Sequence, residues 1–324
     1  ANALSVVAEK GPGVAALESF LKEAAATAAD PGAPVAARTS AIALLGHTPF
    51  ERGLGALGAL LDARQAPELQ LQLVRALERA GDPRGAEILA ETARWSRYTP
   101  QIREAAVGAL VSKPAMAKVL FTAIERGAIR PTEVSSVRRS QLMKHADPGV
   151  KSAATLLFQS LEGGDRMAVY REHKAVLAAP ARADRGAPVF TRSCSACHTF
   201  RGAGGKVGPD LTGMRNQPAD ALLLHILVPN YEVVPAYQAI TVTLQDGRSV
   251  SGCVTAETDA SLTLRTASGA EETILRGAVA ATSSTGVSLM PDGLEQTMTR
   301  EELADLIAYL KSEPAGEEIG RAHV

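Results

Sequence analysis

Aromatic residues and cysteines are both scarce in this sequence. Phenylalanine, tryptophan and tyrosine together account for 4% of its 324 residues, and there are three cysteines. Three cysteines are too few for the disulfide framework that stabilises many small secreted domains. Because hydrophobic residues still make up 46% of the chain, its cores must be built mainly from aliphatic side chains.

The sequence also lacks an excess of charge and a long apolar run. Its formal net charge is −1 at pH 7, which gives no general electrostatic reason to bind nucleic acid or an anionic membrane. No stretch of about 18 consecutive apolar residues occurs, so we expect no transmembrane span. A chain of this length has room for two or three domains.

Prolines recur at nearly equal intervals in the first half, which is rich in alanine and leucine. Pro34, Pro67, Pro100 and Pro131 are 31 to 33 residues apart, and each suits the first position of a helix. An amphipathic pattern follows the first three prolines and is degraded after the fourth. Second helices are expected between the helices that these prolines begin, at Leu54–Leu61, Ala86–Trp95, Met116–Glu125 and Ser152–Gln159.

This repeat predicts stacked helix pairs, since one pair of this size cannot bury its own apolar face. Residues 1–178 resemble a short HEAT-like α-solenoid. Such an array would serve either as a partner-binding surface or as a spacer that holds the following domain. The sequence favours neither role.

The chemistry of the chain is indicated by the segment Cys194-Ser195-Ala196-Cys197-His198. The pattern C-x-x-C-H is the attachment pattern of a c-type haem. The two thiols would form thioethers with the porphyrin vinyl groups, and the imidazole of His198 would ligate the iron. The sequence therefore predicts one covalently attached haem c.

The signals on either side of this motif occur in the order found in a small cytochrome c. A helix capped by Asp184 and carrying Gly186 and Phe190 leads into the motif. A glycine-rich loop follows His198, and the C-terminal part has a capping box before an amphipathic helix. The other segments of this series are Gly208-Pro209-Asp210-Leu211, the helix entered through Pro218, Ser288-Leu289-Met290-Pro291, and Thr299-x-x-Glu302 with Leu303, Leu306, Ile307 and Leu310.

On these residues, the segment 184–313 resembles the haem-binding c-type cytochrome domain of planctomycete and verrucomicrobial secreted proteins. In that family the domain often follows helical repeats in the C-terminal part of membrane-bound or sugar-type dehydrogenases. The resemblance implies that the Pro209 carbonyl accepts a hydrogen bond from His198. It also implies electron transfer with a redox partner, either a dehydrogenase or a downstream acceptor. The catalytic β-propeller of those dehydrogenases is not among these residues, so we expect no catalytic activity in this chain.

Two methionines are candidates for the second axial ligand of the iron. Met290 lies just before the last helix and is followed by proline, as in the ligand loop of cytochromes c, whereas Met214 is only sixteen residues after His198. We favour Met290, and we expect Met298 to be a core residue and His225 a surface residue. We expect Phe190 to pack against the last helix near Tyr309. The expected haem-binding residues are Cys194, Cys197, His198, Phe190, Pro209, Leu211 and Met290, with His198 and Met290 as the metal ligands.

Between residues 236 and 286 the apolar period changes from 3.6 to 2, which is typical of strands. Alternate residues from Ile240 to Leu244 are apolar, and Asp246-Gly247 is a strong hairpin signal. The sequence predicts an antiparallel β unit of four or five strands inserted into the cytochrome domain. Cys253 falls on one of these strands, where we expect a buried free thiol rather than a reactive one.

The expected fold is therefore mainly α. It consists of a HEAT-like α-solenoid (1–178), an all-α class I-like cytochrome c domain (184–313) carrying the β insertion (236–286), and a tail (314–324). The expected function is that of a mono-haem electron-transfer protein, with a haem-based sensor and an interaction scaffold as alternatives. Because haem is attached outside the bacterial cytoplasm, we expect a periplasmic or otherwise extracytoplasmic protein whose signal peptide, absent from this sequence, has been removed.

Overall fold

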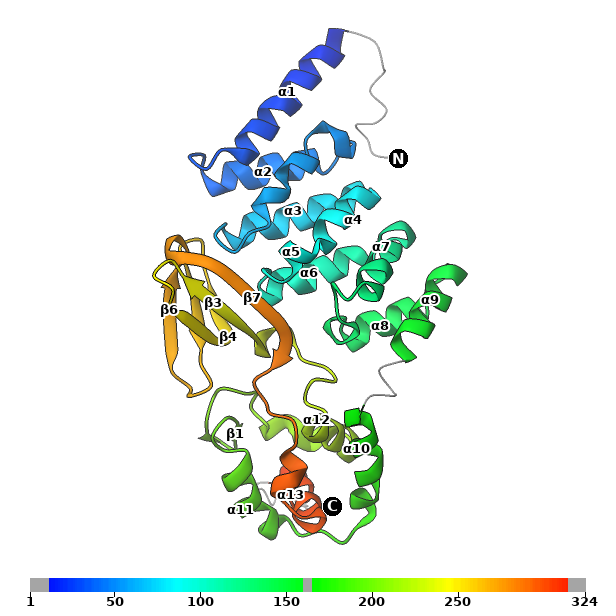
Figure 1. The fold of residues 1–324 in the computed structure, drawn as a ribbon, viewed down its shortest axis with the longest axis vertical. Coiled ribbons are helices and arrows are strands. Elements are labelled where there is room, and N and C mark those ends of the chain that lie inside the picture. Colours follow the sequence, from blue (N-terminus) through cyan, green and yellow to red (C-terminus); the bar gives the residue numbers. More distant parts are fainter. Residues whose placement is uncertain (1–11, 160–164, 314–324) are drawn as a thin grey trace, which may run out of the picture. The chain divides into compact units, whose positions relative to one another are not determined.

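The computed structural model describes residues 12–159 and 165–313. These residues form two compact units (Figure 1). The first unit consists of residues 12–159, 234–265 and 271–287, and the second of residues 165–233, 266–270 and 288–313. The β segment therefore interrupts the second unit in sequence but folds with the helices of the first.

The first unit begins with helices that follow one another in chain order (Figure 1). Proline is the first residue of most of them, as expected at a position whose N–H has no intrahelical partner. These helices are α1 (Pro12–Ala29), α2 (Val35–Leu45), α3 (Pro67–Ala80), α4 (Pro83–Ala90), α5 (Thr92–Trp95), α6 (Pro100–Leu110), α7 (Pro114–Glu125), α8 (Ser136–Met143) and α9 (Pro148–Gln159).

Two of the predicted second helices differ from the prediction. The segment Leu54–Leu61 forms a 3₁₀ helix, η3 (Gly55–Leu60), because two of its residues are glycines, which disfavour the α-helix. The segment Ala86–Trp95 is divided between α4 and α5, since Glu91 has an extended backbone with ψ of 123°. Two further 3₁₀ turns occur in this part, η2 (Phe50–Arg52) and η4 (Pro131–Glu133).

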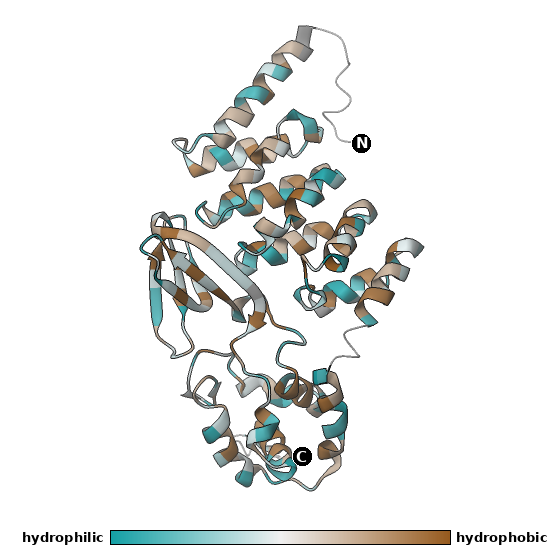
Figure 2. Cartoon of the chain, in the orientation of Figure 1, coloured by the Kyte–Doolittle hydropathy of each residue, from teal (hydrophilic) through white to brown (hydrophobic). Residues whose placement is uncertain are grey.

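Most helices of this unit bury an apolar face, and apolar and polar colours alternate around the ribbons in Figure 2. In α3, Leu69, Leu73 and Leu77 are spaced four residues apart, and each is at most 1% exposed. The helix ends at Gly81, whose φ of 66° lies in the left-handed region. The Asp82 carboxylate then caps α4 by accepting a hydrogen bond from the backbone N–H of Arg84.

A five-stranded sheet completes the first unit (Figure 1). Its spatial order is β6-β5-β4-β3-β7, and the β3–β4, β4–β5 and β5–β6 pairs are antiparallel. The hairpin predicted at Asp246-Gly247 is present, with Gly247 at φ of 87°. Ile240, Val242 and Leu244 are buried, as their alternation predicted. The strands are β3 (Gln238–Leu244), β4 (Ser249–Glu257), β5 (Ser261–Arg265), β6 (Glu271–Leu275) and β7 (Val279–Ser288), with 3₁₀ turns η8 (Pro235–Tyr237) and η9 (Arg276–Ala278).

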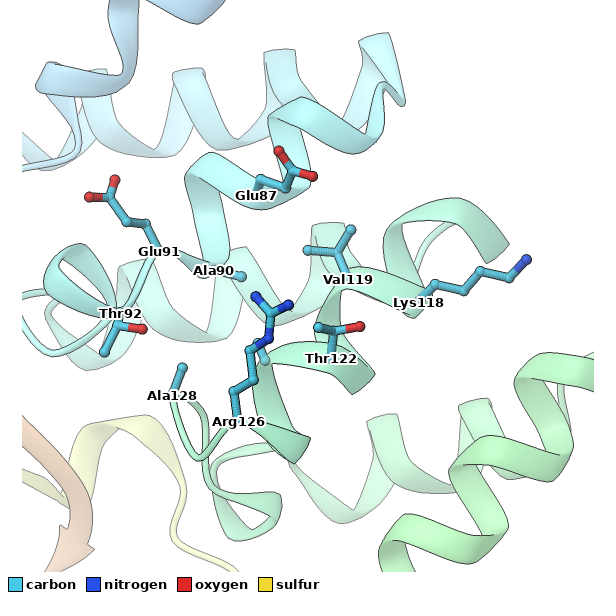
Figure 3. Close-up of a pocket in the computed structure, with 10 residues that line it drawn as sticks. Glu87, Ala90, Glu91, Thr92, Lys118, Val119, Thr122, Arg126 and Ala128 are labelled. Atoms are coloured by element: carbon cyan, nitrogen blue, oxygen red, sulfur yellow. The ribbon is translucent and has the colours of Figure 1, made fainter.

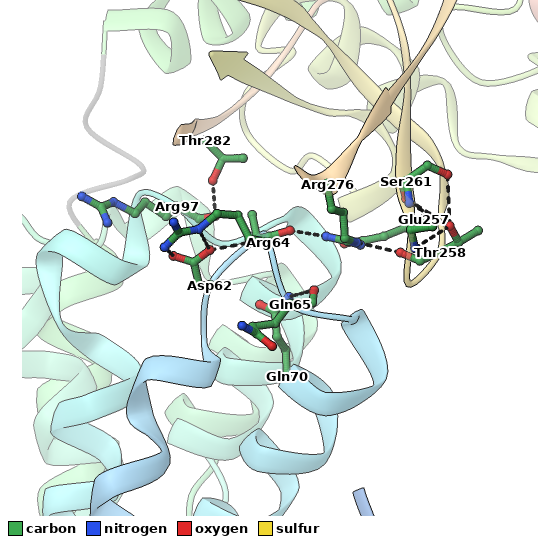
Figure 4. A network of polar contacts seen from close by, with 12 residues as sticks. Asp62, Arg64, Gln65, Gln70, Arg97, Glu257, Thr258, Ser261, Arg276 and Thr282 are labelled. Atoms are coloured by element: carbon green, nitrogen blue, oxygen red, sulfur yellow. Dashed lines mark hydrogen bonds and ion pairs between the residues drawn. The ribbon is translucent and has the colours of Figure 1, made fainter. Parts of the chain in front are cut away.

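Buried polar contacts fix this sheet to the helices of the same unit (Figure 4). Arg276, which is 3% exposed, donates to the carbonyls of Ala63 and Thr258 and pairs with Glu257 at 2.8 Å. The Thr282 hydroxyl donates to the Arg97 carbonyl at 2.5 Å. Polar contacts to backbone carbonyls therefore join the sheet to the helical part of the first unit.

The expectation of an all-α cytochrome domain is wrong. The C-terminal region contains two antiparallel β structures: the large sheet and a hairpin of β1 (Thr199–Phe200) with β2 (Ala203–Gly204) directly after His198. The hairpin forms because Arg201 and Gly202 both take positive φ values, 53° and 81°, which close a tight turn. The glycine-rich segment predicted as a loop is therefore part of a β structure.

The second unit is built around one apolar core. Its helices are α10 (Asp165–His173), α11 (Ala183–Ser193), α12 (Ala219–Leu227) and α13 (Arg300–Lys311), with 3₁₀ turns η6 (Lys174–Ala178), η7 (Thr212–Asn216) and η10 (Leu294–Thr297). The core includes Val189, Phe190, Leu223, Leu227, Leu303, Leu306 and Ile307. No helix in the described parts of the chain combines the length and apolar character needed to cross a bilayer.

Helices α11 and α13 are in close contact at Gly186. A Cβ atom at this position would lie 2.0 Å from the Asp305 carbonyl oxygen, so only glycine permits the approach. The buried Asp305 carboxylate also accepts the backbone N–H of Arg182 at 2.6 Å, directly before α11. Asp184 is thus not the cap that the sequence predicted: the cap position is Arg182, and Asp184 lies in the first turn. The capping box of Thr299 with Glu302 is confirmed at the start of α13.

Candidate functional site

The Cys-x-x-Cys-His segment forms one turn that continues from α11. The backbone N–H of Cys194 donates to the Phe190 carbonyl at 2.8 Å, and that of His198 donates to the Cys194 carbonyl at 2.9 Å. Both cysteines are free and half-buried. Burial raises the pKa of the Cys194 thiol to about 11, so it is protonated at neutral pH. The turn therefore presents two free thiols beside one imidazole.

The imidazole of His198 is oriented by a single backbone carbonyl. Its Nδ1 atom donates to the Pro209 carbonyl oxygen at 2.9 Å, since a carbonyl can only accept. Burial lowers the pKa of His198, so the ring is neutral at neutral pH. With the proton on Nδ1, the lone pair of Nε2 is available to a metal ion, and the carbonyl fixes the ring as partners of metal-bound histidines do. This is the hydrogen bond that the family resemblance implied.

The loop after the motif lies directly against it, at glycines that leave no room for a side chain. A Cβ atom at Gly208 would lie 2.4 Å from Cε1 of His198, and one at Gly205 would lie 2.1 Å from the Ala196 carbonyl oxygen. The loop is closed by the Leu211 N–H, which donates to the Thr199 carbonyl at 2.8 Å. Backbone rather than side chains therefore forms this wall of the site.

An aromatic cluster lies behind the motif. The Phe190 ring is 5.9 Å from that of Tyr309, so the predicted packing of Phe190 against the last helix is confirmed. The centroid of the Phe200 ring lies 5.5 Å from that of Phe190 and 5.0 Å from that of Tyr309. The Arg201 guanidinium lies over the Phe200 ring. Phe200 and Arg201 were not predicted as site residues, since their only signal in the sequence is their position immediately after the motif. The cluster ties β1 and the motif to α13.

Met290, Met214 and Met298 lie in different environments. Met290 is half-buried in the turn after β7, where its N–H donates to the Ser288 hydroxyl at 3.0 Å. Met214 and Met298 are partly buried against the apolar core of the second unit, together with Leu211. His225 is exposed on α12, as predicted. These positions leave the assignment of the second axial ligand to Met290 as a proposal.

These residues fit a covalently attached haem. The two thiols and the neutral imidazole are the donor set that such a haem requires, and the glycine loop packs against the ring of His198 while the Pro209 carbonyl orients it. The third cysteine, Cys253, lies on β4 and is 3% exposed. Burial raises the pKa of its thiol to about 11, so it is a structural residue, as predicted.

A pocket of about 450 Å³ lies elsewhere, in the first unit between α4 and α7 (Figure 3). Its wall combines the acidic Glu87 and Glu91 with the basic Lys118 and Arg126. None of the residues of the haem motif lines it. The pocket is therefore separate from the chemistry that the motif indicates.

Comparison with known families supports this interpretation of the motif. A family model described as cytochrome C oxidase, cbb3-type, subunit III matches residues 181–248. The match supports a c-type cytochrome domain in this part of the chain. Such a domain implies covalently bound haem and suggests haem-based electron transfer, and such domains are typically extracytoplasmic. No curated protein matches the chain.

Proposed function

We propose that this chain is a mono-haem c-type cytochrome that transfers electrons, with haem attached to Cys194 and Cys197 and ligated by His198 and Met290. The observation that carries the proposal is the hydrogen bond from Nδ1 of His198 to the Pro209 carbonyl, which leaves Nε2 for the iron. The two half-buried free thiols on the same turn supply the covalent attachment.

Each protein group has a distinct part in this function. Cys194 and Cys197 would hold the macrocycle through thioether bonds, and the Pro209 carbonyl orients the ring of His198. Phe190 closes the back of the pocket by its contacts with Phe200 and Tyr309. Haem, when bound, supplies an iron that cycles between the ferric and ferrous states, and a thioether ligand favours the ferrous state.

The setting of this electron transfer is also a proposal. We infer a periplasmic or otherwise extracytoplasmic protein that accepts electrons from a dehydrogenase domain or partner, or passes them to a downstream acceptor. The helices of residues 12–159 would be a HEAT-like array that binds such a partner. Residues 184–313 would form the cytochrome domain, with 236–286 as its insertion in sequence.

The test is an absorption spectrum and redox titration of the holoprotein. Low-spin spectra in both oxidation states, with a weak ferric methionine–iron band in the red and reversible one-electron reduction, are the expected result. A high-spin, five-coordinate ferrous spectrum that shifts fully on addition of CO would favour a haem-based sensor instead.

A further inference from the structure

Helix α10 comes before the haem motif in the chain and packs into the apolar core of the second unit. Its Met167 and Tyr170 are 6% and 7% exposed and belong to the same cluster as Leu227 of α12. The Tyr170 hydroxyl also donates to the Asp220 carboxylate of α12 at 2.8 Å. Buried contacts therefore fix the position of α10 within this unit.

One arginine of α10, Arg166, reaches two other segments of the same unit. Its guanidinium donates to both carboxylate oxygens of Glu295 in η10, at 2.9 and 2.8 Å. Two of its nitrogens also donate to the Leu227 carbonyl at the end of α12, at 3.0 and 2.5 Å. The side chains of Arg166 and Glu295 are 26% and 7% exposed, so much of the surrounding water is excluded from the pair. Arg166 thus joins α10, the end of α12 and η10 through one planar group.

These contacts lie at one end of the segment that carries the proposed sixth ligand, residues 288–297, which we call the ligand loop. At its start, the Ser288 N–H donates to the Asn230 side chain at 2.9 Å, and the Ser288 hydroxyl accepts the Met290 N–H at 3.0 Å. At its end, η10 begins four residues after Met290 and is held by Arg166. The ligand loop is therefore fixed on both sides of Met290, by residues of the second unit alone.

We propose that Arg166 is a positioning residue for Met290: its contacts with η10 and α12 hold the ligand loop so that the thioether binds the iron. The inference rests on the proposed function, since it requires Met290 to be the sixth ligand. A guanidinium suits this role because its planar fork binds both oxygens of one carboxylate and stays charged at neutral pH. Helix α10 is thereby part of the haem-binding structure, although it carries no residue of the haem motif.

The test compares holoproteins in which the contacts of Arg166 are intact or broken. The double variant Arg166→Met with Glu295→Gln removes both charges and leaves neither one buried alone. The matched control is Tyr170→Phe, which removes the hydrogen bond from the same helix to Asp220 and keeps the contacts of Arg166. The readouts are the ferric methionine–iron band, the apparent Kd of the ferrous protein for CO, and hydrogen exchange of residues 288–297.

The double variant should lose intensity in the band and exchange faster in the ligand loop. Its apparent Kd for CO should be lower by about tenfold, because the loss of one charge-assisted hydrogen bond changes an equilibrium constant by about that factor. Tyr170→Phe should leave all three readouts unchanged, even where it lowers the thermal stability of the second unit. A folded double variant with the band, exchange and CO affinity of the unsubstituted protein would overturn the inference. Equal changes in Tyr170→Phe would also overturn it, since the docking of α10 alone would then explain them.

A second variant, Arg166→Lys, tests the same contacts with the positive charge kept. A lysine ammonium lacks the planar fork, so it cannot bind both Glu295 oxygens and the Leu227 carbonyl in the same geometry. The band and CO exclusion should therefore weaken in the same direction, by a smaller factor. If Arg166→Lys leaves both unchanged, the inference is contradicted even where the double variant does not fold. Absence of a methionine–iron band in the unsubstituted protein would instead contradict the His/Met proposal itself.

Discussion

Truncation of Phe190 should destabilise the second unit strongly. Its ring is 5% exposed and contacts the rings of Phe200 and Tyr309 at 5.5 and 5.9 Å. The Phe190→Ala substitution removes both contacts and leaves a cavity in the core, which typically costs about 3–5 kcal/mol. The two ring pairs contribute about 0.5–1.5 kcal/mol each beyond the buried area. We therefore expect a decrease of about 3–5 kcal/mol in the free energy of unfolding of this unit.

The assay is chemical denaturation of the holoprotein, followed by haem absorbance. The matched control is Phe121→Ala in α7, because Phe121 is also 5% exposed but lies in the first unit. Phe121→Ala should lower the free energy of unfolding of the first unit by a similar amount when unfolding is followed by the helical signal. It should leave the haem absorbance of the native protein unchanged. A loss below about 1 kcal/mol for Phe190→Ala, the average of all substitutions, would refute the assignment of this ring to the back of the pocket.

Three further outcomes are expected. Met290→Ala should abolish the ferric methionine–iron band and lower the reduction potential, whereas the same loss in Met214→Ala would contradict the ligand assignment. Glu295→Gln breaks a bidentate pair with Arg166 at 2.8 and 2.9 Å and should cost about 1–3 kcal/mol at neutral pH in thermal unfolding of the second unit. Because the hydrogen bonds from Arg166 lower the pKa of Glu295, this difference should persist above pH 4.5 and vanish as the pH falls further; a difference that is independent of pH would argue against the pair. The buried thiol of Cys253 should react with iodoacetamide at neutral pH only after unfolding, and modification of the folded protein would show that β4 is not as described.

Features set by short segments could be predicted from the sequence. The motif at Cys194–His198 specifies its own chemistry, and the hairpin at Asp246-Gly247 follows from residues that accept positive φ. The capping box of Thr299 and Glu302 is equally local. In each case the determining residues are within a few positions of one another, so the pattern can be recognised without knowing the tertiary structure.

Features that depend on residues far apart in the chain could not be predicted from the sequence. The period-2 pattern predicted strands, yet it did not show that the sheet packs in the unit of the N-terminal helices, because the partners of Arg276 and Thr282 lie about 200 residues earlier. The turn of β1 and β2 requires Arg201 at positive φ, which a non-glycine residue rarely adopts, so the expectation of an all-α domain was wrong. The contact of Arg103 with Ser284 joins segments that no local pattern connects.

The central claim is that haem is attached covalently at Cys194 and Cys197. The most direct measurement is the intact mass of the chain, produced with haem-attachment machinery and then denatured, together with peptide mapping of the modified residues. The account predicts one haem per chain, retained after denaturation and located on the peptide that contains both cysteines. A chain with the mass of the unmodified polypeptide, or haem that is released on denaturation, would contradict it.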